Sequence, residues 1–416
     1  MVSIKQRLGK LMGNEIIRDN FVLFVCVTIF NVIGYLFHFF AGRLLGPEDY
    51  GVFAVLLSIL YLSNVILTVI QTSITKFASD LKADKGILSY LFVNSLRRLS
   101  FYGSLLTIVF FIISPWLAKF LKIDNVWPVL ITGTFFFLSF IVSVNRGMLQ
   151  GLQEFKKLGL SYICEGIIKL ISGVVLILIG LGSSGAVLAF SISYLGAFLI
   201  TLLPLKSLFY TQKVHFDTKQ VYKYSFWVLI ALSLLTLMYT IDVVLVKHFL
   251  DPLSSGYYGA LSLMGKIIFF GTLSVSMVMF PKSSELFEAK GASKHIMYKS
   301  LGLVLLFGIP VTLFYFLFPE FAINLLFGKS YFGMAPYMWV YGATMTLFSL
   351  TYVISFYLLS IKQYIFLLIL GVFVVLEAVI IWLFHSTIGV VAYIMLGLMF
   401  ALFIIMMILA GTTKNG

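Results

Sequence analysis

Residues 21–73 decide the fold class, and they read FVLFVCVTIFNVIGYLFHFFAGRLLGPEDYGVFAVLLSILYLSNVILTVIQTS. Two apolar runs, 21–45 and 50–73, are separated only by the four residues GPED. Each run has the roughly 20 residues that a helix needs to cross a bilayer core of about 30 Å. Because proline cannot continue a helix, the stretch predicts two transmembrane helices joined by a short turn.

The whole chain has the composition of a polytopic membrane protein. Of its 416 residues, 61% are hydrophobic and only 11% are charged, whereas a soluble domain has about a quarter charged. The mean hydropathy is +1.07. We therefore predict an all-α polytopic membrane protein, in which lipid covers much of the surface. The predicted spans number about twelve: 21–45, 50–73, 99–121, 127–149, 158–181, 185–208, 224–248, 256–280, 299–319, 333–358, 364–384 and 388–410.

Lysine and arginine are distributed unevenly over the connecting segments. With the N-terminus inside, 22 of the 29 basic residues fall in cytoplasmic segments, five in outer loops and two within spans. An excess of basic residues on the cytoplasmic side is the positive-inside pattern. We predict a multi-pass protein of the cytoplasmic membrane with both termini cytoplasmic. The net charge of +13 reflects this topology and does not indicate a nucleic-acid partner.

A single offset of 205 residues aligns the two halves of the chain. Pro47 and Gly51 match Pro252 and Gly256, and further matches follow in the next charged stretch of each half. Six spans per half predict two six-helix bundles of the same orientation, related by a pseudo-two-fold axis along the membrane normal. The predicted organisation is an interfacial N-terminal helix over 1–20, a first bundle over 21–210, a cytoplasmic linker over 211–223 and a second bundle over 224–416.

Three stretches resemble one transporter family. The segment GRLLGPEDYGVF at 42–53 resembles the first outer turn of the polysaccharide-export, oligosaccharide-flippase branch of the multidrug/oligosaccharidyl-lipid/polysaccharide exporter superfamily. The segment RGMLQG at 146–151 resembles that family's turn after span four, and 242–256 is similar to its seventh span and following turn. Many members have fourteen spans, whereas twelve are predicted here.

The resemblance implies a multidrug-and-toxin-exporter-like fold. It also implies a function: moving a polyprenyl-phosphate-linked or polyprenyl-diphosphate-linked oligosaccharide from the inner to the outer leaflet. Surface polysaccharide or glycan assembly is the process that such a lipid would serve. The implied partners are the lipid-linked oligosaccharide, membrane lipid, a coupling proton or sodium ion, and polysaccharide-assembly enzymes.

Charged residues within the spans are the candidate site residues. An ionisable group deep in a span costs roughly 2.5–3.5 kcal/mol on insertion scales, so each marks a functional hypothesis. Sugars and phosphates cannot cross hydrocarbon unassisted, and a flippase therefore needs a polar, cationic interior. Five residues stand out: Glu165 and Lys169 in the fifth span, Asp242 in the seventh, Lys266 in the eighth and Glu377 in the eleventh.

Four basic residues are candidates to bind the anionic head of the substrate: Lys169, Lys266, Arg146 and Arg43. Arg146, near the inner end of the fourth span, has an alternative interpretation as a positive-inside anchor. Arg43, at the outer mouth, has an alternative interpretation as a snorkelling side chain. Lys169 lies i,i+4 from Glu165, so a local ion pair is the alternative to substrate binding.

The acidic residues Asp242, Glu165 and Glu377 are candidates to carry a coupling ion or to act as counter-ions. Asp242 is a possible partner of Lys266 on the adjacent helix. The histidines and acidic residues show neither a metal-ligand spacing nor a catalytic grouping. We therefore predict no metal, no cofactor, no catalytic residue and no enzymatic activity.

Three other functional hypotheses remain at this point. A cation-coupled multidrug exporter of the same superfamily would show an acidic, aromatic cavity with few basic residues. A membrane-embedded glycosyltransferase or polymerase would require a large outer loop or paired acids near one interface. A non-catalytic assembly partner is only weakly constrained by the sequence.

Overall fold

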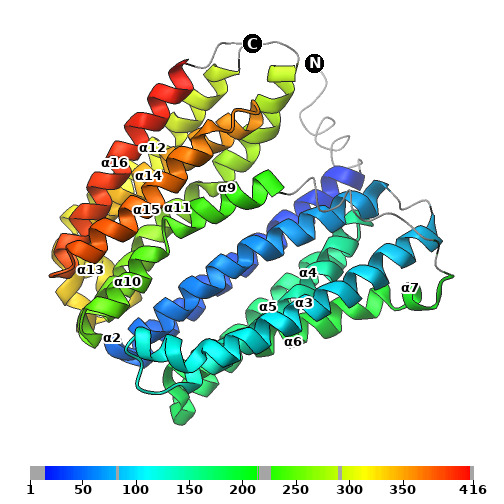
Figure 1. Cartoon of the computed structure of the whole chain (residues 1–416), viewed down its shortest axis with the longest axis horizontal. Helices are drawn as coiled ribbons and strands as arrows, with labels where there is room; N and C mark the ends of the chain where they lie inside the picture. The colour runs from blue at the N-terminus through cyan, green and yellow to red at the C-terminus, as the bar shows by residue number, and fades with distance from the viewer. Residues whose placement is uncertain (1–14, 81–83, 213, 215–225, 289–292, 413–416) are drawn as a thin grey trace, which may run out of the picture. The chain divides into compact units, whose positions relative to one another are not determined.

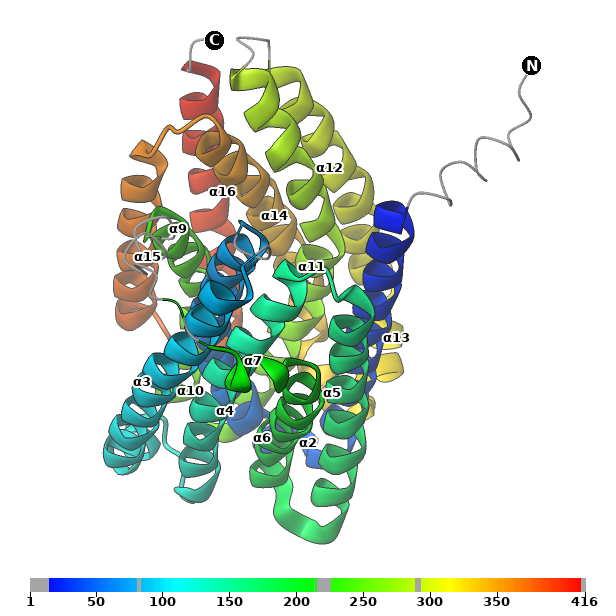
Figure 2. The same ribbon diagram turned by 90° about the vertical axis from the view of Figure 1, so that its right-hand side faces the viewer.

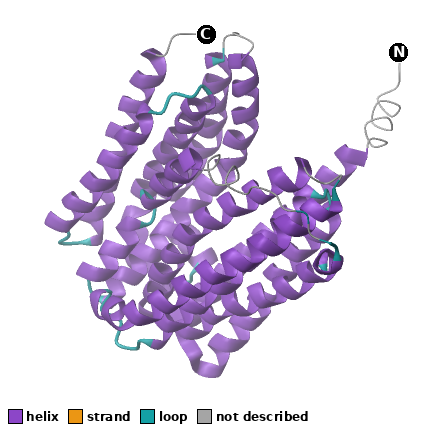
Figure 3. Cartoon of the chain, turned by 45° about the vertical axis from the view of Figure 1, so that its right-hand side comes forward, coloured by secondary structure: helices purple, strands orange, loops and turns teal. Residues whose placement is uncertain are grey.

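The structure is a computed structural model that describes residues 15–80, 84–212, 214, 226–288 and 293–412. All regular structure in these ranges is helical (Figure 3). Most of the predicted interfacial helix, residues 1–14, lies outside the described residues. So do 213 and 215–223 of the predicted linker.

The helices follow one another with short connections (Figure 1). In chain order they are α2 (Glu15–Asp80), α3 (Lys85–Phe120), α4 (Trp127–Gly151), α5 (Phe155–Leu176), η1 (Ile177–Leu181), α6 (Gly182–Leu202), η2 (Leu203–Leu205), α7 (Ser207–Tyr210), α9 (Phe226–Leu237), α10 (Ile241–Phe249), α11 (Pro252–Glu288), α12 (Lys294–Leu317), α13 (Pro319–Leu326), η3 (Lys329–Tyr337), α14 (Met338–Ser360), α15 (Ile365–Leu383) and α16 (Ile388–Thr412).

Ten helices of the described residues are long and apolar enough to cross a membrane. Two of them, Val25–Ser79 and Phe155–Leu205, have 55 and 51 residues, about twice the length that one crossing needs. Each is broken near its middle by a glycine in the left-handed region, Gly46 with φ 71° and Gly180 with φ 91°. Ten helices therefore supply about twelve crossings, and the predicted all-helical, polytopic fold is confirmed.

The seventh predicted span is interrupted. Helix α9 ends at Leu237 and α10 begins at Ile241, with a short turn between them. Asp242 lies in the first turn of α10. A carboxylate is favoured there because the unpaired N–H groups and the helix dipole make the N-terminus of a helix positive.

The described residues form two compact units. The first contains the described residues within Met1–Leu44 and Ser63–Leu229, and the second contains those within Leu45–Leu62 and Ile230–Gly416. Within the first, α4 packs on α3 and α6, and α6 also packs on α5 (Figures 1 and 2). Within the second, α14 packs on α11, α12 and α16. The segment after the Gly46 break thus belongs with the second unit, although it lies in the first half of the sequence.

Candidate functional site

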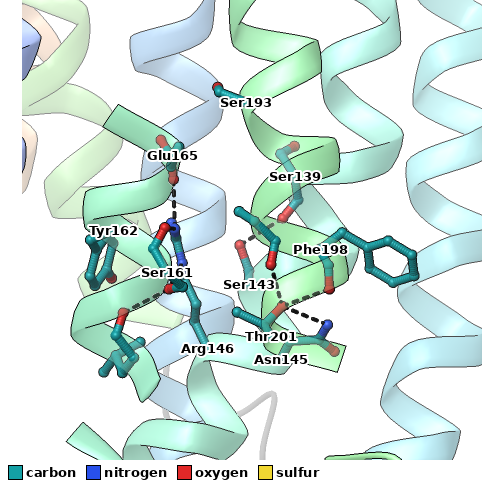
Figure 4. Close-up of polar contacts among 12 residues, drawn as sticks. Ser139, Ser143, Asn145, Arg146, Ser161, Tyr162, Glu165, Ser193, Phe198 and Thr201 are labelled. Carbon is teal, nitrogen blue, oxygen red and sulfur yellow. Dashed lines mark hydrogen bonds and ion pairs between the residues drawn. The ribbon is translucent and has the colours of Figure 1, made fainter. Parts of the chain in front are cut away.

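The first unit buries an ion pair between α4 and α5. The Nη2 atom of Arg146 lies 2.6 Å from the Oε2 atom of Glu165, and both residues are 4% exposed (Figure 4). Arg146 also donates from Nε to the Ser161 hydroxyl at 3.2 Å and from Nη2 to the Ser161 carbonyl at 3.3 Å. Its guanidinium lies 4.0 Å from the centre of the Tyr162 ring. The partner of Glu165 is thus Arg146, and not Lys169 on its own helix.

Lys169 lies further along the same face of α5. Ser161, Glu165 and Lys169 are spaced four residues apart, so α5 presents them as one stripe. The Lys169 ammonium lies between 5.0 and 5.9 Å from the centres of three aromatic rings, those of Phe30, Phe37 and Phe190. Cation–π attraction operates at such distances.

Among the described residues, Lys169 has no ion-pair or hydrogen-bond partner. Its interactions with Glu165 and Arg146 are electrostatic, without a close contact. The side chain is 8% exposed, and its ammonium is not fully sealed from solvent. Aromatic faces do not accept the three N–H groups as oxygen atoms would, so the ammonium retains donors for an anion.

The second unit fixes a carboxylate between tyrosines. The Oδ2 atom of Asp242 accepts hydrogen bonds from the hydroxyl of Tyr258 at 2.9 Å and from that of Tyr341 at 2.5 Å. The Tyr341 hydroxyl also lies 3.2 Å from the Ser262 hydroxyl. The other oxygen, Oδ1, is buried and has no hydrogen-bond partner among the described residues.

Two further charges lie in the second unit. Glu377 is fully buried, both of its carboxylate oxygens lack a hydrogen-bond partner among the described residues, and it interacts electrostatically with Asp242. Lys266 is 3% exposed, and its ammonium lies 5.5 Å and 5.3 Å from the centres of the Tyr61 and Tyr239 rings. In the described part of the chain Lys266 forms no ion pair, although it interacts electrostatically with Asp242.

Comparison with known proteins identifies the family. The profile of a family described as polysaccharide biosynthesis proteins matches residues 41–336, which is most of the chain. The chain belongs to this polysaccharide biosynthesis family. An uncharacterized membrane protein of Methanocaldococcus jannaschii is 28% identical over 274 residues, which are 61% of this chain. The chain spans 64% of the length of that curated relative.

Solved structures show how this member of the polysaccharide biosynthesis family is folded. An inward-facing multidrug resistance MATE family transporter of the MOP superfamily matches with a TM-score of 0.77 and 12% identity, over 92% of this chain and 94% of that one. The lipid II flippase MurJ, in an inward closed conformation, matches with a TM-score of 0.72 and 15% identity, over 95% and 88%.

A third structure is a MOP superfamily transporter from Pyrococcus furiosus whose binding pocket is described as having reverse polarity, suggesting a different function. It matches with a TM-score of 0.66 and 14% identity, over 94% of both chains. These likenesses confirm the predicted multidrug-and-toxin-exporter-like fold.

The structure groups most of the predicted site residues and leaves one apart. Arg146 and Glu165 pair in the first unit, where Lys169 is buried on the same face of α5 as Glu165, whereas Asp242, Lys266 and Glu377 are buried in the second. Arg43 is exposed, and its guanidinium lies 4.5 Å from the centre of the Phe39 ring. A cation at a helix end that stacks on its own helix agrees with the snorkelling interpretation.

The sequence interpretation missed the hydrogen-bonding partners of these charges. Tyr258 and Tyr341 hold Asp242, while Ser161 and Tyr162 surround Arg146. Only Tyr258 carried a sequence signal. The 205-residue offset aligns it with Phe53, two residues after the glycine that recurs in both halves. Lys247, one of the five basic residues that the charge pattern assigns to outer loops, lies in α10 and is 3% exposed.

Proposed function

We propose that the protein is a transporter that flips a polyprenyl-phosphate-linked or polyprenyl-diphosphate-linked oligosaccharide from the inner to the outer leaflet by alternating access. Its membership in the polysaccharide biosynthesis family supports the class of process. The fold that it shares with MATE and MurJ transporters supports transport as the activity. In this proposal both termini lie in the cytoplasm, and the oligosaccharide lipid is collected from the cytoplasmic leaflet.

The observation that carries the proposal is the sign of the buried charge in the first unit. Among the described residues of this unit, two buried cations, Arg146 and Lys169, accompany a single buried anion, Glu165. Because the pair between Arg146 and Glu165 is neutral, Lys169 remains as an uncompensated cation. A buried charge without a partner is costly, and a phosphate group of the substrate would supply the missing anion.

The sign of this charge also separates the proposal from a drug exporter of the same superfamily. An exporter of cationic drugs needs an acidic site to hold its substrate. The first unit has the opposite balance, since Glu165 is the only buried carboxylate among the residues whose burial is described there, and Arg146 already holds it. A cationic compound would therefore meet repulsion where a phosphate meets attraction.

Replacing Lys169 or Lys266 by alanine is expected to slow flipping of a polyprenyl diphosphate-linked oligosaccharide about tenfold or more. Hydrogen bonds to charged groups contribute about 1.5–3 kcal/mol, and 1.4 kcal/mol corresponds to a factor of ten. The measurement is the appearance of the lipid in the outer leaflet of proteoliposomes. Lys299→Ala is the matched control, because Lys299 is exposed on α12. Native rates in both lysine variants would disprove the assignment of these residues.

The second unit supplies the candidate for energy coupling. Asp242 and Glu377 are buried carboxyl groups with three oxygens that lack hydrogen-bond partners among the described residues. A proton or a cation bound there would satisfy those oxygens and cancel the repulsion between the two groups. Binding and release of that ion would then favour different conformations of the transporter.

Asp242→Asn and Glu377→Gln are expected to abolish the acceleration of flipping by an ion gradient while leaving slow, gradient-independent flipping. An amide cannot take up a coupling proton and binds a cation far more weakly than a carboxylate does. The rate would be measured in proteoliposomes under an imposed proton gradient and, separately, under a sodium gradient. Glu320→Gln is the control, because Glu320 is exposed on α13. A gradient response that survives in both carboxyl variants would contradict the coupling role.

A further inference from the structure

The end of α4 near Gly151 presents hydrogen-bond donors that the packing of the first unit leaves unused. We infer that Arg146 and Gln150 form a subsite for the phosphate or diphosphate group of the carrier lipid, framed by Tyr162 and Gln71. The inference rests on the proposed function, and it names where the phosphate group of the substrate binds and which side chains donate hydrogen bonds to it. None of the predicted binding residues other than Arg146 belongs to this subsite.

Arg146 supplies the first pair of donors. Its Nε and both N–H groups of Nη2 are used by Ser161 and Glu165. Among the described residues, its Nη1 atom, which carries two more N–H groups, has no hydrogen-bond partner, yet this atom is not sealed from solvent. Glu165, Ser161 and the Tyr162 ring fix the guanidinium on its other sides. A buried, rigidly held arginine thus keeps one free edge.

Gln150 supplies the second pair, one helical turn along α4. Its Oε1 atom accepts from the Gln71 amide at 2.9 Å and from the Thr75 hydroxyl at 3.3 Å. Gln71 in turn donates to the Tyr162 hydroxyl at 3.2 Å. These bonds occupy the acceptor side of Gln150 and leave its Nε2 group without a partner among the described residues. Gln150, Gln71 and Tyr162 are all half-buried, so the cluster is accessible at its edge.

The chemistry of the free groups selects the ligand. Residues i and i+4 of a helix lie on one face, about 5–6 Å apart at Cβ, so the two donor pairs point to the same side of α4. Arg146 and Gln150 present N–H donors without a partner among the described residues, whereas the Oε1 acceptor of Gln150 is engaged by Gln71 and Thr75. Sugar hydroxyls need both donors and acceptors, but phosphate oxygens only accept, and guanidinium suits them particularly well. The arrangement therefore fits a phosphate or diphosphate.

The subsite also lies at a useful place on the path through the first unit. Arg146 contacts Ser161, which is eight residues before Lys169 on α5, or about 12 Å along the helix axis. Gln150 lies in the last turn of α4, at the end of the fourth span that is predicted to be cytoplasmic. A phosphate would be held first by Gln150 and Arg146. The uncompensated ammonium of Lys169 would then attract it deeper into the bilayer.

The test is binding by the full chain in lipid nanodiscs, with polyprenyl diphosphate, the neutral polyprenol and inorganic pyrophosphate as probes. Gln150→Glu replaces the free donors by a carboxylate that would itself pair with the free edge of Arg146. We expect its affinity for polyprenyl diphosphate to fall about tenfold or more, and its affinity for polyprenol to change less than twofold. Gln363→Glu adds the same charge in the connection between α14 and α15 and is expected to bind as the native chain does.

Further arms separate a local effect from misfolding and from failure of the proposed function. Gln150→Ala removes the donors without adding charge, together with the acceptor that Gln71 and Thr75 use. Its affinity for polyprenyl diphosphate is expected to fall several-fold while the variant still unfolds cooperatively. If the Gln150 variants lose affinity for pyrophosphate and for polyprenyl diphosphate in parallel, the subsite recognises the phosphate groups alone. Unchanged diphosphate binding in both Gln150 variants, with flipping intact, would overturn the subsite and leave the function standing. A native chain that binds no polyprenyl diphosphate would overturn both.

Discussion

Arg146→Leu is expected to destabilise the protein by about 3–5 kcal/mol, because it leaves the Glu165 carboxylate buried without its cation. Glu165→Leu is expected to cost a similar amount, since Arg146 and Lys169 then have no buried anion among the described residues of the first unit. The cost is large because both residues are 4% exposed, so the charge that remains is largely removed from water. The measurement is the free energy of unfolding of each variant in the same detergent.

The double variant, Arg146→Leu with Glu165→Leu, separates stability from function. Replacing a buried ion pair by apolar side chains of similar volume is often neutral or stabilising, so most of the lost stability is expected to return. Flipping and diphosphate binding are expected to remain absent, because the free edge of Arg146 is gone. A double variant that flips at the native rate would show that the pair has only a structural role.

The sequence predicted the helices well because the bilayer imposes a simple rule on them. Each crossing needs about 20 apolar residues with every backbone group bonded within the helix, and α4, α15 and α16 match their predicted ranges within a few residues. The interruption of the seventh span between Leu237 and Ile241 was missed. The apolar run continues through it, and the hydropathy of a run carries no information about such a break.

The site was only partly predictable, since pairing depends on how helices pack against one another. The i,i+4 spacing of Glu165 and Lys169 suggested a local pair, but α4 places the guanidinium of Arg146 closer. Burial of the charged residues followed from their position in spans. The partners of Asp242 did not, because Tyr341 lies 99 residues away in sequence. Such contacts are set by tertiary structure and leave no local pattern.

The internal repeat has a structural consequence at its two turns. Pro47 begins the segment after the Gly46 break, and Pro252 begins α11, as the 205-residue offset predicts. The backbones of the two turns touch within the second unit. A Cβ atom added at Gly51 would lie 2.9 Å from the backbone nitrogen of Gly256, and one added at Gly256 would overlap the carbonyl group of Pro47. The glycines are therefore needed for space, since larger residues would force the turns apart.

Gly256→Ala is expected to lower the free energy of unfolding by about 3 kcal/mol, the upper end of the usual cost of overpacking. The atoms in the way belong to the Pro47 backbone, which cannot yield as a flexible side chain would. Gly302→Ala is the matched control, because Gly302 is exposed on α12 with no atom within 4 Å of the added Cβ. Alanine favours a helix over glycine by about 1 kcal/mol, so the control is expected to be neutral or slightly stabilising. A loss of stability in Gly256→Ala that Gly302→Ala does not show would assign the cost to the contact between the two turns. Equal effects of the two substitutions on the free energy of unfolding would contradict this explanation.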